Sequence, residues 1–75
     1  MRENYIVFGK PGCSYCTRAV KELEKRNLDF AYIDVSIPAN LEELKLRLPS
    51  VRTVPQIWLA EAHVGGYDQF MESFE

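Results

Sequence analysis

The 75-residue chain lacks the features that identify several other classes of protein. Its nine basic residues are matched by eleven acidic ones, so no strongly positive surface favours nucleic-acid binding. The longest apolar run near its start, residues 5–8, is too short for a membrane span or a signal-peptide core. We therefore expect no membrane association and a cytoplasmic location. A hydrophobic content of 47% excludes a disordered chain, and the length predicts a single domain over residues 1–75.

Cysteine is scarce, since the chain contains only Cys13 and Cys16. Stable disulfides are rare in the cytoplasm, and a bond between these two would close a very short loop. It would stabilise the fold by much less than the ~3 kcal/mol expected for a fifteen-residue loop. A structural zinc site takes four ligands, whereas the chain adds only the distant His63 to its cysteines. The other structural alternative is that both cysteines are unreactive core residues. A redox role explains the pair better than any of these structural roles.

The first half of the chain predicts a strand, a helix and a second strand. Residues 5–8 are continuously apolar, as in a strand buried on both faces. Apolar residues then recur at helical spacing from Cys13 onward, and Asn27 is a plausible helix end. Residues 30–35 predict a second buried strand. A strand, helix and strand in so short a segment indicate a parallel β-α-β unit.

The second half predicts a helix, two strands and a last helix. Asn40 with Glu43 resembles a capping box at a helix start, and Pro49 would end that helix. Residues 56–59 and 63–64 predict two short strands joined by a tight turn, with Trp58 in the core and His63 simply filling a strand position. The last helical stripe consists of Tyr67, Phe70, Met71 and Phe74. The order β-α-β-α-β-β-α favours a thioredoxin-like α/β domain, with a mixed four-stranded sheet and three helices.

The Cys-x-x-Cys segment lies at the start of the first predicted helix. Residues three apart on a helix share a face, at a separation that suits a disulfide. Cys13 would lie at the helix N-terminus, where unpaired N–H groups favour a thiolate, and Lys10 adds a positive charge nearby. Cys16 lies one turn further, on the buried stripe, and should stay a thiol until it attacks a mixed disulfide. The two positions predict a nucleophile and a resolving thiol.

Three segments together give a more specific signal than this motif alone. They are Lys10-Pro11-Gly12-Cys13-Ser14-Tyr15-Cys16, Arg52-Thr53-Val54-Pro55-Gln56-Ile57-Trp58 and His63-Val64-Gly65-Gly66-Tyr67-Asp68. At these intervals the chain resembles the dithiol glutaredoxins, in particular their short bacterial or phage type. The resemblance implies a glutathione-disulfide oxidoreductase that reduces protein disulfides and glutathione mixed disulfides. Cys13 would be its nucleophile and Cys16 its resolving thiol.

The resemblance also implies a binding groove for glutathione, the co-substrate. Val54-Pro55 would be a cis bond, and the backbone of Val54 would pair with the cysteine of glutathione like an added strand. Gly66 would begin a helix whose free N–H groups, at Tyr67 and Asp68, bind the γ-glutamyl carboxylate. The implied groove consists of Lys10, Tyr15, Arg52, Thr53, Val54, Pro55, Gly66, Tyr67 and Asp68, with Lys10 and Arg52 near the glycine carboxylate. The family usually has an acid where this chain has Gln69, so either Asp68 or Gln69 could face the glutathione amine.

Ser14 replaces the proline of the commonest glutaredoxin motif. In some relatives a serine there accompanies a [2Fe–2S] cluster bridging two subunits, and Cys13 would then be the ligand. A cluster carrier or sensor is thus one alternative, and a redoxin reduced by thioredoxin reductase is another. The main interpretation predicts no resident metal, a monomer, and disulfide-containing protein substrates, with ribonucleotide reductase as the family-level expectation.

Overall fold

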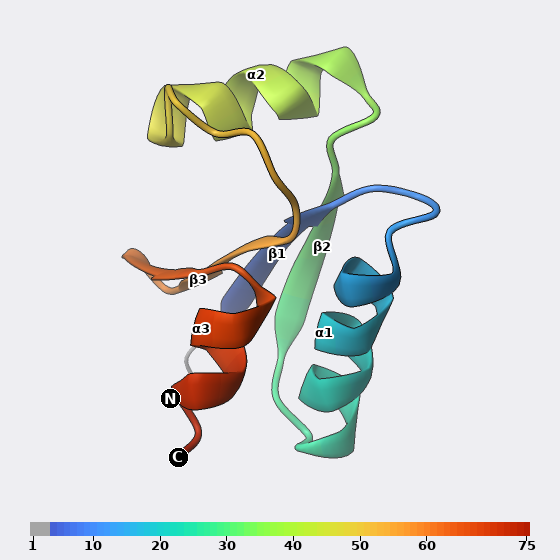
Figure 1. Ribbon diagram of the computed structural model, residues 1–75, viewed down its shortest axis with the longest axis vertical. Coiled ribbons are helices and arrows are strands. Elements are labelled where there is room, and N and C mark those ends of the chain that lie inside the picture. Colours follow the sequence, from blue (N-terminus) through green and yellow to red (C-terminus); the bar gives the residue numbers. More distant parts are fainter. Residues whose placement is uncertain (1–3) are drawn as a thin grey trace.

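The computed structural model describes residues 4–75, which form four strands and three helices (Figure 1). In chain order these are β1 (Tyr5–Gly9), α1 (Ser14–Lys25), β2 (Phe30–Asp34), α2 (Pro38–Arg47), β3 (Gln56–Leu59), β4 (Ala62–Gly65) and α3 (Tyr67–Glu72). The strands form one sheet in the order β2-β1-β3-β4. β1 and β2 are parallel, whereas β3 is antiparallel to both β1 and β4. This is the thioredoxin-like arrangement that the sequence predicts.

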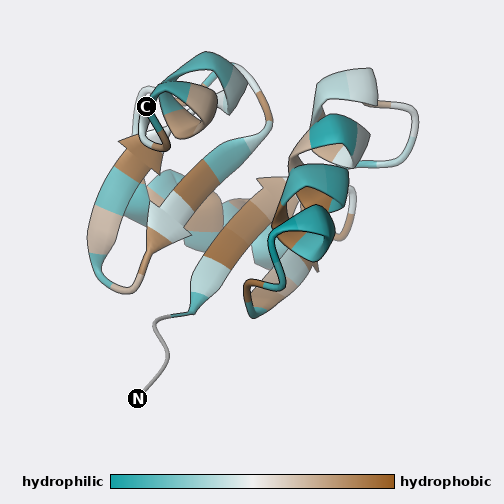
Figure 2. Cartoon of the chain, turned by 90° about the horizontal axis from the view of Figure 1, so that it is seen from below, coloured by the Kyte–Doolittle hydropathy of each residue, from teal (hydrophilic) through white to brown (hydrophobic). Residues whose placement is uncertain are grey.

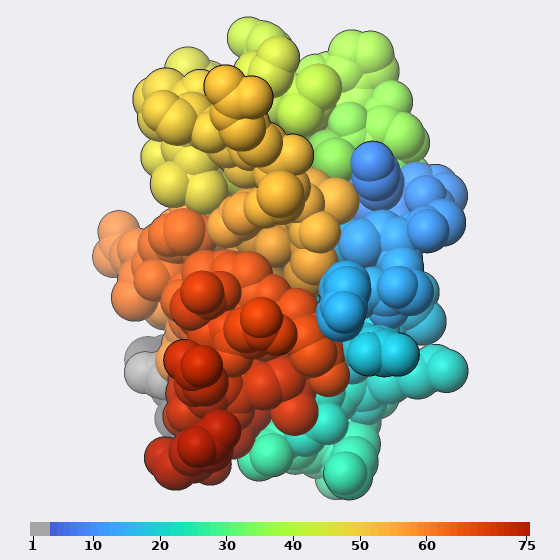
Figure 3. All heavy atoms as spheres, viewed as in Figure 1, coloured from blue at the N-terminus to red at the C-terminus, as the bar shows by residue number. Residues whose placement is uncertain are grey.

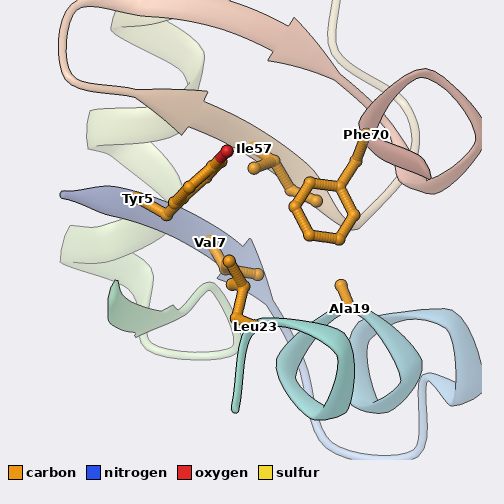
Figure 4. Close-up of a cluster of buried hydrophobic side chains, with 6 residues drawn as sticks. All are labelled: Tyr5, Val7, Ala19, Leu23, Ile57 and Phe70. Carbon is orange, nitrogen blue, oxygen red and sulfur yellow. The ribbon is translucent and has the colours of Figure 1, made fainter. Parts of the chain in front are cut away.

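Helices cover both faces of the sheet, as Figure 1 shows, with α1 and α3 on one face and α2 on the other. Because successive side chains of a strand point to opposite faces, β1 contributes to two separate cores. Tyr5 and Val7 pack with Leu23 of α1 and Phe70 of α3 (Figure 4). Phe8 packs with residues of the α2 face, including Leu44. The predicted burial of β1 on both faces is therefore confirmed.

The helices are amphipathic, and their apolar sides face the sheet. In Figure 2 hydrophilic colours dominate the outer side of α1, while hydrophobic colours lie along the strands. Asn27 has a left-handed φ of 59° just after α1, which confirms the predicted helix end. α2 ends at Arg47, immediately before the segment containing Pro49, as expected.

The prediction of a second buried strand is wrong in one respect. Residues 30–34 do form β2, but Ala31 and Tyr32 are exposed and the other three residues are half-buried. The reason is position, since β2 is an edge strand with β1 as its single neighbour. An apolar sequence alone does not distinguish a central strand from an edge strand that is half covered.

The predicted capping box of the second helix is also wrong. α2 begins at Pro38, with Ile37 as N-cap and no side-chain cap. Proline suits this first helical position because its missing N–H would have no partner there. Asn40 instead donates from Nδ2 to the backbone carbonyl of Asp34 at 3.0 Å, which ties α2 to the end of β2.

In the β3–β4 hairpin, Trp58 and His63 occupy the structural positions that the sequence predicted for them. Trp58 is buried, 5.4 Å from the ring of Phe8 between centroids. His63 lies across from it on β4 and its Nε2 is 3.0 Å from Oε1 of Gln56. Among the described helices, none is long and apolar enough to cross a membrane.

Candidate active site

Cys13 is the N-cap of α1 and its sulfur is held by that helix. Its backbone is extended, with φ −94° and ψ 108°, and its Sγ accepts a hydrogen bond from the backbone N–H of Cys16 at 3.2 Å. A second contact joins the Sγ to the carbonyl oxygen of Val54 at 3.7 Å. The side chain is half-buried, so the sulfur is reachable from solvent. An amide N–H directed at the sulfur stabilises a thiolate there.

Cys16 lies one turn further along α1 and is almost completely buried, with 1% of its surface exposed. Burial raises the pKa of the Cys16 thiol from an ordinary value of 9.0 to about 11, and its hydrogen bond with Cys13 adds to this effect. Cys16 is therefore a protonated thiol near neutral pH. The structure places the two cysteines as predicted, with the first accessible at a helix start and the second inside.

The loop before β3 forms the wall opposite Cys13. The bond between Val54 and Pro55 is cis, as the sequence resemblance implied. Next to this loop lies a cavity of about 250 Å³. Its lining consists of Tyr15, Thr53, Val54, Pro55, Gly66, Tyr67, Asp68 and Gln69. The rings of Tyr15 and Tyr67 lie 5.4 Å apart between centroids, so α1 meets α3 across this cavity.

A larger cavity of about 630 Å³ lies on the other side of the same wall. It shares Tyr15, Thr53 and Val54 with the smaller one and reaches Cys13. Three basic residues line it, namely Lys10, Arg52 and Lys45 of α2. Leu41 and Leu44 give it an apolar floor. Every predicted groove residue lines one or both of the two cavities, whereas Cys13 lines the larger one and Cys16 lines neither.

α3 begins after Gly66, as the resemblance implied. Gly66 is the N-cap, but its N–H donates to Oε1 of Gln69 at 3.0 Å. The Gly66 amide is therefore already bound by the chain itself, whereas the resemblance gave the carboxylate to the amides of Tyr67 and Asp68. The amides of Tyr67 and Asp68 follow in the first turn, where helices have no internal acceptor for them. Gln69 thus caps its own helix, and Asp68 is the carboxylate that lines the small cavity.

Three residues near the site were missed from the sequence. Lys45 lines the large cavity but resembles any solvated helix residue. Gly9 ends β1 against Cys16, and Tyr32 of β2 reaches the same place. A hydroxyl-bearing ring within an otherwise apolar strand was the only signal for Tyr32, and the prediction of a buried strand obscured it.

Segments far apart in the sequence meet at this site. Figure 3 shows the blue segment around residues 10–15 beside the gold segment near residue 52 and the orange segment after residue 64. The described residues contain no group of three or more His, Cys, Asp or Glu side chains able to hold a metal ion. A thioredoxin-like fold with a half-buried and a fully buried cysteine on one helix turn defines a thiol–disulfide redox protein.

Comparisons with known proteins specify the family. The glutaredoxin family model matches residues 5–64. Glutaredoxin 1 of Escherichia coli strain K12 is 39% identical over 72 residues, covering 87% of this chain and 85% of the relative. The chain belongs to the glutaredoxin family, whose function is glutathione-dependent thiol–disulfide oxidoreduction.

Solved structures agree with this assignment. The crystal structure of a buckwheat glutaredoxin–glutathione complex superposes with a TM-score of 0.81 at 27% identity, covering 96% of this chain and 68% of that one. The structure of reduced Escherichia coli glutaredoxin superposes with a TM-score of 0.77 at 32% identity, covering 93% and 91%.

Proposed function

We propose that Cys13 is the nucleophile in the reduction of protein disulfides and glutathione mixed disulfides, and that Cys16 resolves the mixed disulfide when the substrate is a protein. The observation that carries this proposal is the contrast between the reachable Sγ of Cys13, with its amide donor, and the buried Sγ of Cys16. The Cys13 thiolate attacks one sulfur of the substrate disulfide, and the other sulfur leaves as a thiolate. Cys16, once deprotonated, attacks Cys13 in the mixed disulfide and releases the second substrate thiolate. Two glutathione molecules then reduce the Cys13–Cys16 disulfide and leave as glutathione disulfide.

The smaller cavity fits the γ-glutamyl half of glutathione. The backbone of Val54 lines it and could pair with the peptide as an added strand. The first-turn amides of Tyr67 and Asp68 could bind the γ-glutamyl carboxylate. Because Gln69 is engaged with Gly66, we assign the contact with the glutathione amine to Asp68. The bound glutathione of the buckwheat relative supports this groove.

The larger cavity fits the other end of the peptide. Lys10 and Arg52 line it close to Cys13 and could bind the glycine carboxylate. Protein substrates would approach over the same surface, and ribonucleotide reductase is proposed as one of them from the family resemblance alone. A monomer and a cytoplasmic location stay predictions of the sequence.

A coupled assay tests the reductant. With glutathione, glutathione reductase and NADPH, the protein should reduce a mixed disulfide of glutathione and a small thiol. Replacing the first two components by thioredoxin reductase should give no activity. The reverse result would contradict the glutathione groove and favour the redoxin alternative.

A [2Fe–2S] cluster is the second candidate, favoured by the exposed position of Ser14 beside a reachable Cys13. Since Cys16 is buried, each chain would supply only the Cys13 thiolate, and a second chain and two glutathiones would complete the four thiolates. Anaerobic reconstitution with iron, sulfide and glutathione should then give visible absorbance and a dimer, both lost in Ser14→Pro. A colourless monomer would eliminate this candidate.

A further inference from the structure

Cys16 presents a chemical problem that the groove residues do not solve. To resolve a mixed disulfide it must become a thiolate, yet it is buried in a place that favours the neutral thiol. Its backbone N–H already donates to Cys13, so this amide stabilises the other sulfur. A backbone hydrogen bond with Lys10 lowers the pKa of Cys16, but it does not outweigh the burial. A further donor would therefore help when the charge of Cys16 develops.

The structure supplies a donor through an opening at Gly9. A Cβ atom at this position would lie 2.5 Å from Oη of Tyr32 and 2.9 Å from Sγ of Cys16. Both atoms therefore occupy space that any side chain at position 9 would take. The φ angle of Gly9 is not left-handed, so backbone conformation does not require glycine there. The absence of a Cβ is what lets the hydroxyl and the sulfur meet.

We propose that Tyr32 is a positioning residue for the resolving step, in which its hydroxyl donates a hydrogen bond to the Cys16 thiolate through the gap at Gly9. This inference rests on the proposed role of Cys16 as the resolving thiol. Two hydrogen bonds lower the pKa of Cys16 and partly offset its burial, first the backbone bond with Lys10 and then the side-chain bond with Tyr32. The pKa of Tyr32 is raised, mainly by burial and then by the charge of Cys16, so the phenol keeps its proton when Cys16 ionises.

The step balances without any further reactant. Cys16 loses its proton to solvent, and Tyr32 donates a hydrogen bond to the resulting thiolate while keeping its own proton. The thiolate attacks Sγ of Cys13, so the Cys13–Cys16 disulfide forms as the bond from Cys13 to the substrate breaks. The substrate sulfur takes the electron pair of the broken bond and leaves as a thiolate.

Other charged groups around this pair do not provide the same contact. Asp34 lies on the same strand, and its charge, like that of Cys13, raises the pKa of Tyr32. Lys21 and Glu24 of α1 line a cavity of about 370 Å³ with the ring of Tyr32, and they carry opposite charges. The hydroxyl of Tyr32 is thus the polar side-chain group beside Cys16, apart from Cys13 itself.

The test is Tyr32→Phe, which removes the hydroxyl and keeps the ring. Reduced protein is mixed with glutathione disulfide, quenched with acid, and the Cys13–glutathione mixed disulfide is followed by mass spectrometry at several pH values. We expect its decay near neutral pH to slow roughly tenfold, as for loss of a hydrogen bond to a charged group. The pH profile should move upward by about one unit, with a similar rate at high pH. Gly9→Ala, which separates the same two atoms, should move the profile in the same direction.

A background without the resolving thiol provides the control. In Cys16→Ser, adding Tyr32→Phe should leave the rate of small mixed-disulfide reduction unchanged, because that reaction uses Cys13 alone. An unchanged pH profile in Tyr32→Phe would overturn the proposal, as would equal slowing in the Cys16→Ser background. A shift of the pH profile in Gly9→Ala without a shift in Tyr32→Phe would also overturn it. If the mixed disulfide of the unmodified protein never decays, the proposed role of Cys16 fails instead, which is a distinguishable result.

Discussion

Cys13 and Cys16 lie one helical turn apart, yet their surroundings differ in burial and in hydrogen-bond partners. Cys13 lies at the junction of three chain segments and lines the larger cavity, with a helix amide directed at its sulfur. Cys16 faces the sheet, where β1 ends in glycine and β2 contributes a phenol. The first environment offers an accessible sulfur with an amide donor, and the second favours a neutral thiol despite hydrogen bonds with the Lys10 backbone and the Tyr32 side chain. Two identical side chains thus acquire different chemistry from burial and hydrogen bonding alone.

The largest expected effect comes from removing each sulfur in turn. Cys13→Ser should abolish both activities, because the reachable nucleophile is lost. Cys16→Ser should lose the reduction of protein disulfides while it retains deglutathionylation of a small mixed disulfide. Steady-state rates with both substrates measure the difference. If Cys16→Ser were inactive toward the small substrate as well, the division of labour would be wrong.

A second pair of variants distinguishes an effect on glutathione binding from an effect on the stability of the fold. The Cβ of an alanine at position 66 would make only ordinary contacts, the nearest at 3.4 Å to Oε1 of Gln69. The larger Gly66→Val should therefore fold but obstruct the small cavity, raising the KM for glutathione roughly tenfold, or about 1.4 kcal/mol. Gly65 has a φ of 126°, and a Cβ there would lie 2.8 Å from that of Gln69.

Gly65→Ala should accordingly lower the free energy of unfolding by about 1 kcal/mol or more. Urea unfolding and glutathione kinetics on both variants make the comparison. Similar KM changes at both positions, with no loss of stability at Gly65, would contradict the assignment of the groove to the Gly66 side.

The burial of Cys16 predicts a dependence of stability on pH. Its folded pKa of about 11 lies above the ordinary 9.0, so the folded state holds the proton more tightly. The resulting stabilisation is complete below pH 9 and is lost as the pH rises toward 11. Its size is on the order of 2 kcal/mol. Urea unfolding of the reduced protein between these pH values should show the loss, whereas Cys16→Ser should lack this component.

The smallest effect concerns the charged end of the groove. Arg52→Glu should raise the KM for glutathione roughly two- to fivefold, because an exposed ion pair contributes up to about 1 kcal/mol. The effect should decrease as salt is added. Lys25→Glu makes the same charge change in the last turn of α1, outside both cavities, and should leave the KM unchanged. Equal effects of the two substitutions would show that the KM for glutathione responds only to the net charge of the protein.

The local sequence pattern was sufficient to predict the structure wherever neighbouring residues determine the conformation of the chain. The apolar run of β1, the stripe of α1 ending at Asn27 and the position of Cys13 as N-cap were all predicted from neighbouring residues. The two errors concern competition between distant groups. Asn40 binds the carbonyl of Asp34 rather than capping a helix, and β2 lies at the edge of the sheet.

The sequence by itself determined the order of elements, the central strand and the pair of cysteines three residues apart, because these follow from local periodicity and spacing. It also carried the family resemblance that implied the groove. Only the tertiary structure decided that Gln69 satisfies Gly66 and that Tyr32 meets Cys16 above Gly9. In both contacts the side chain has several possible partners. The start of α3 selects the one for Gln69, and the packing of β1, β2 and α1 selects the one for Tyr32.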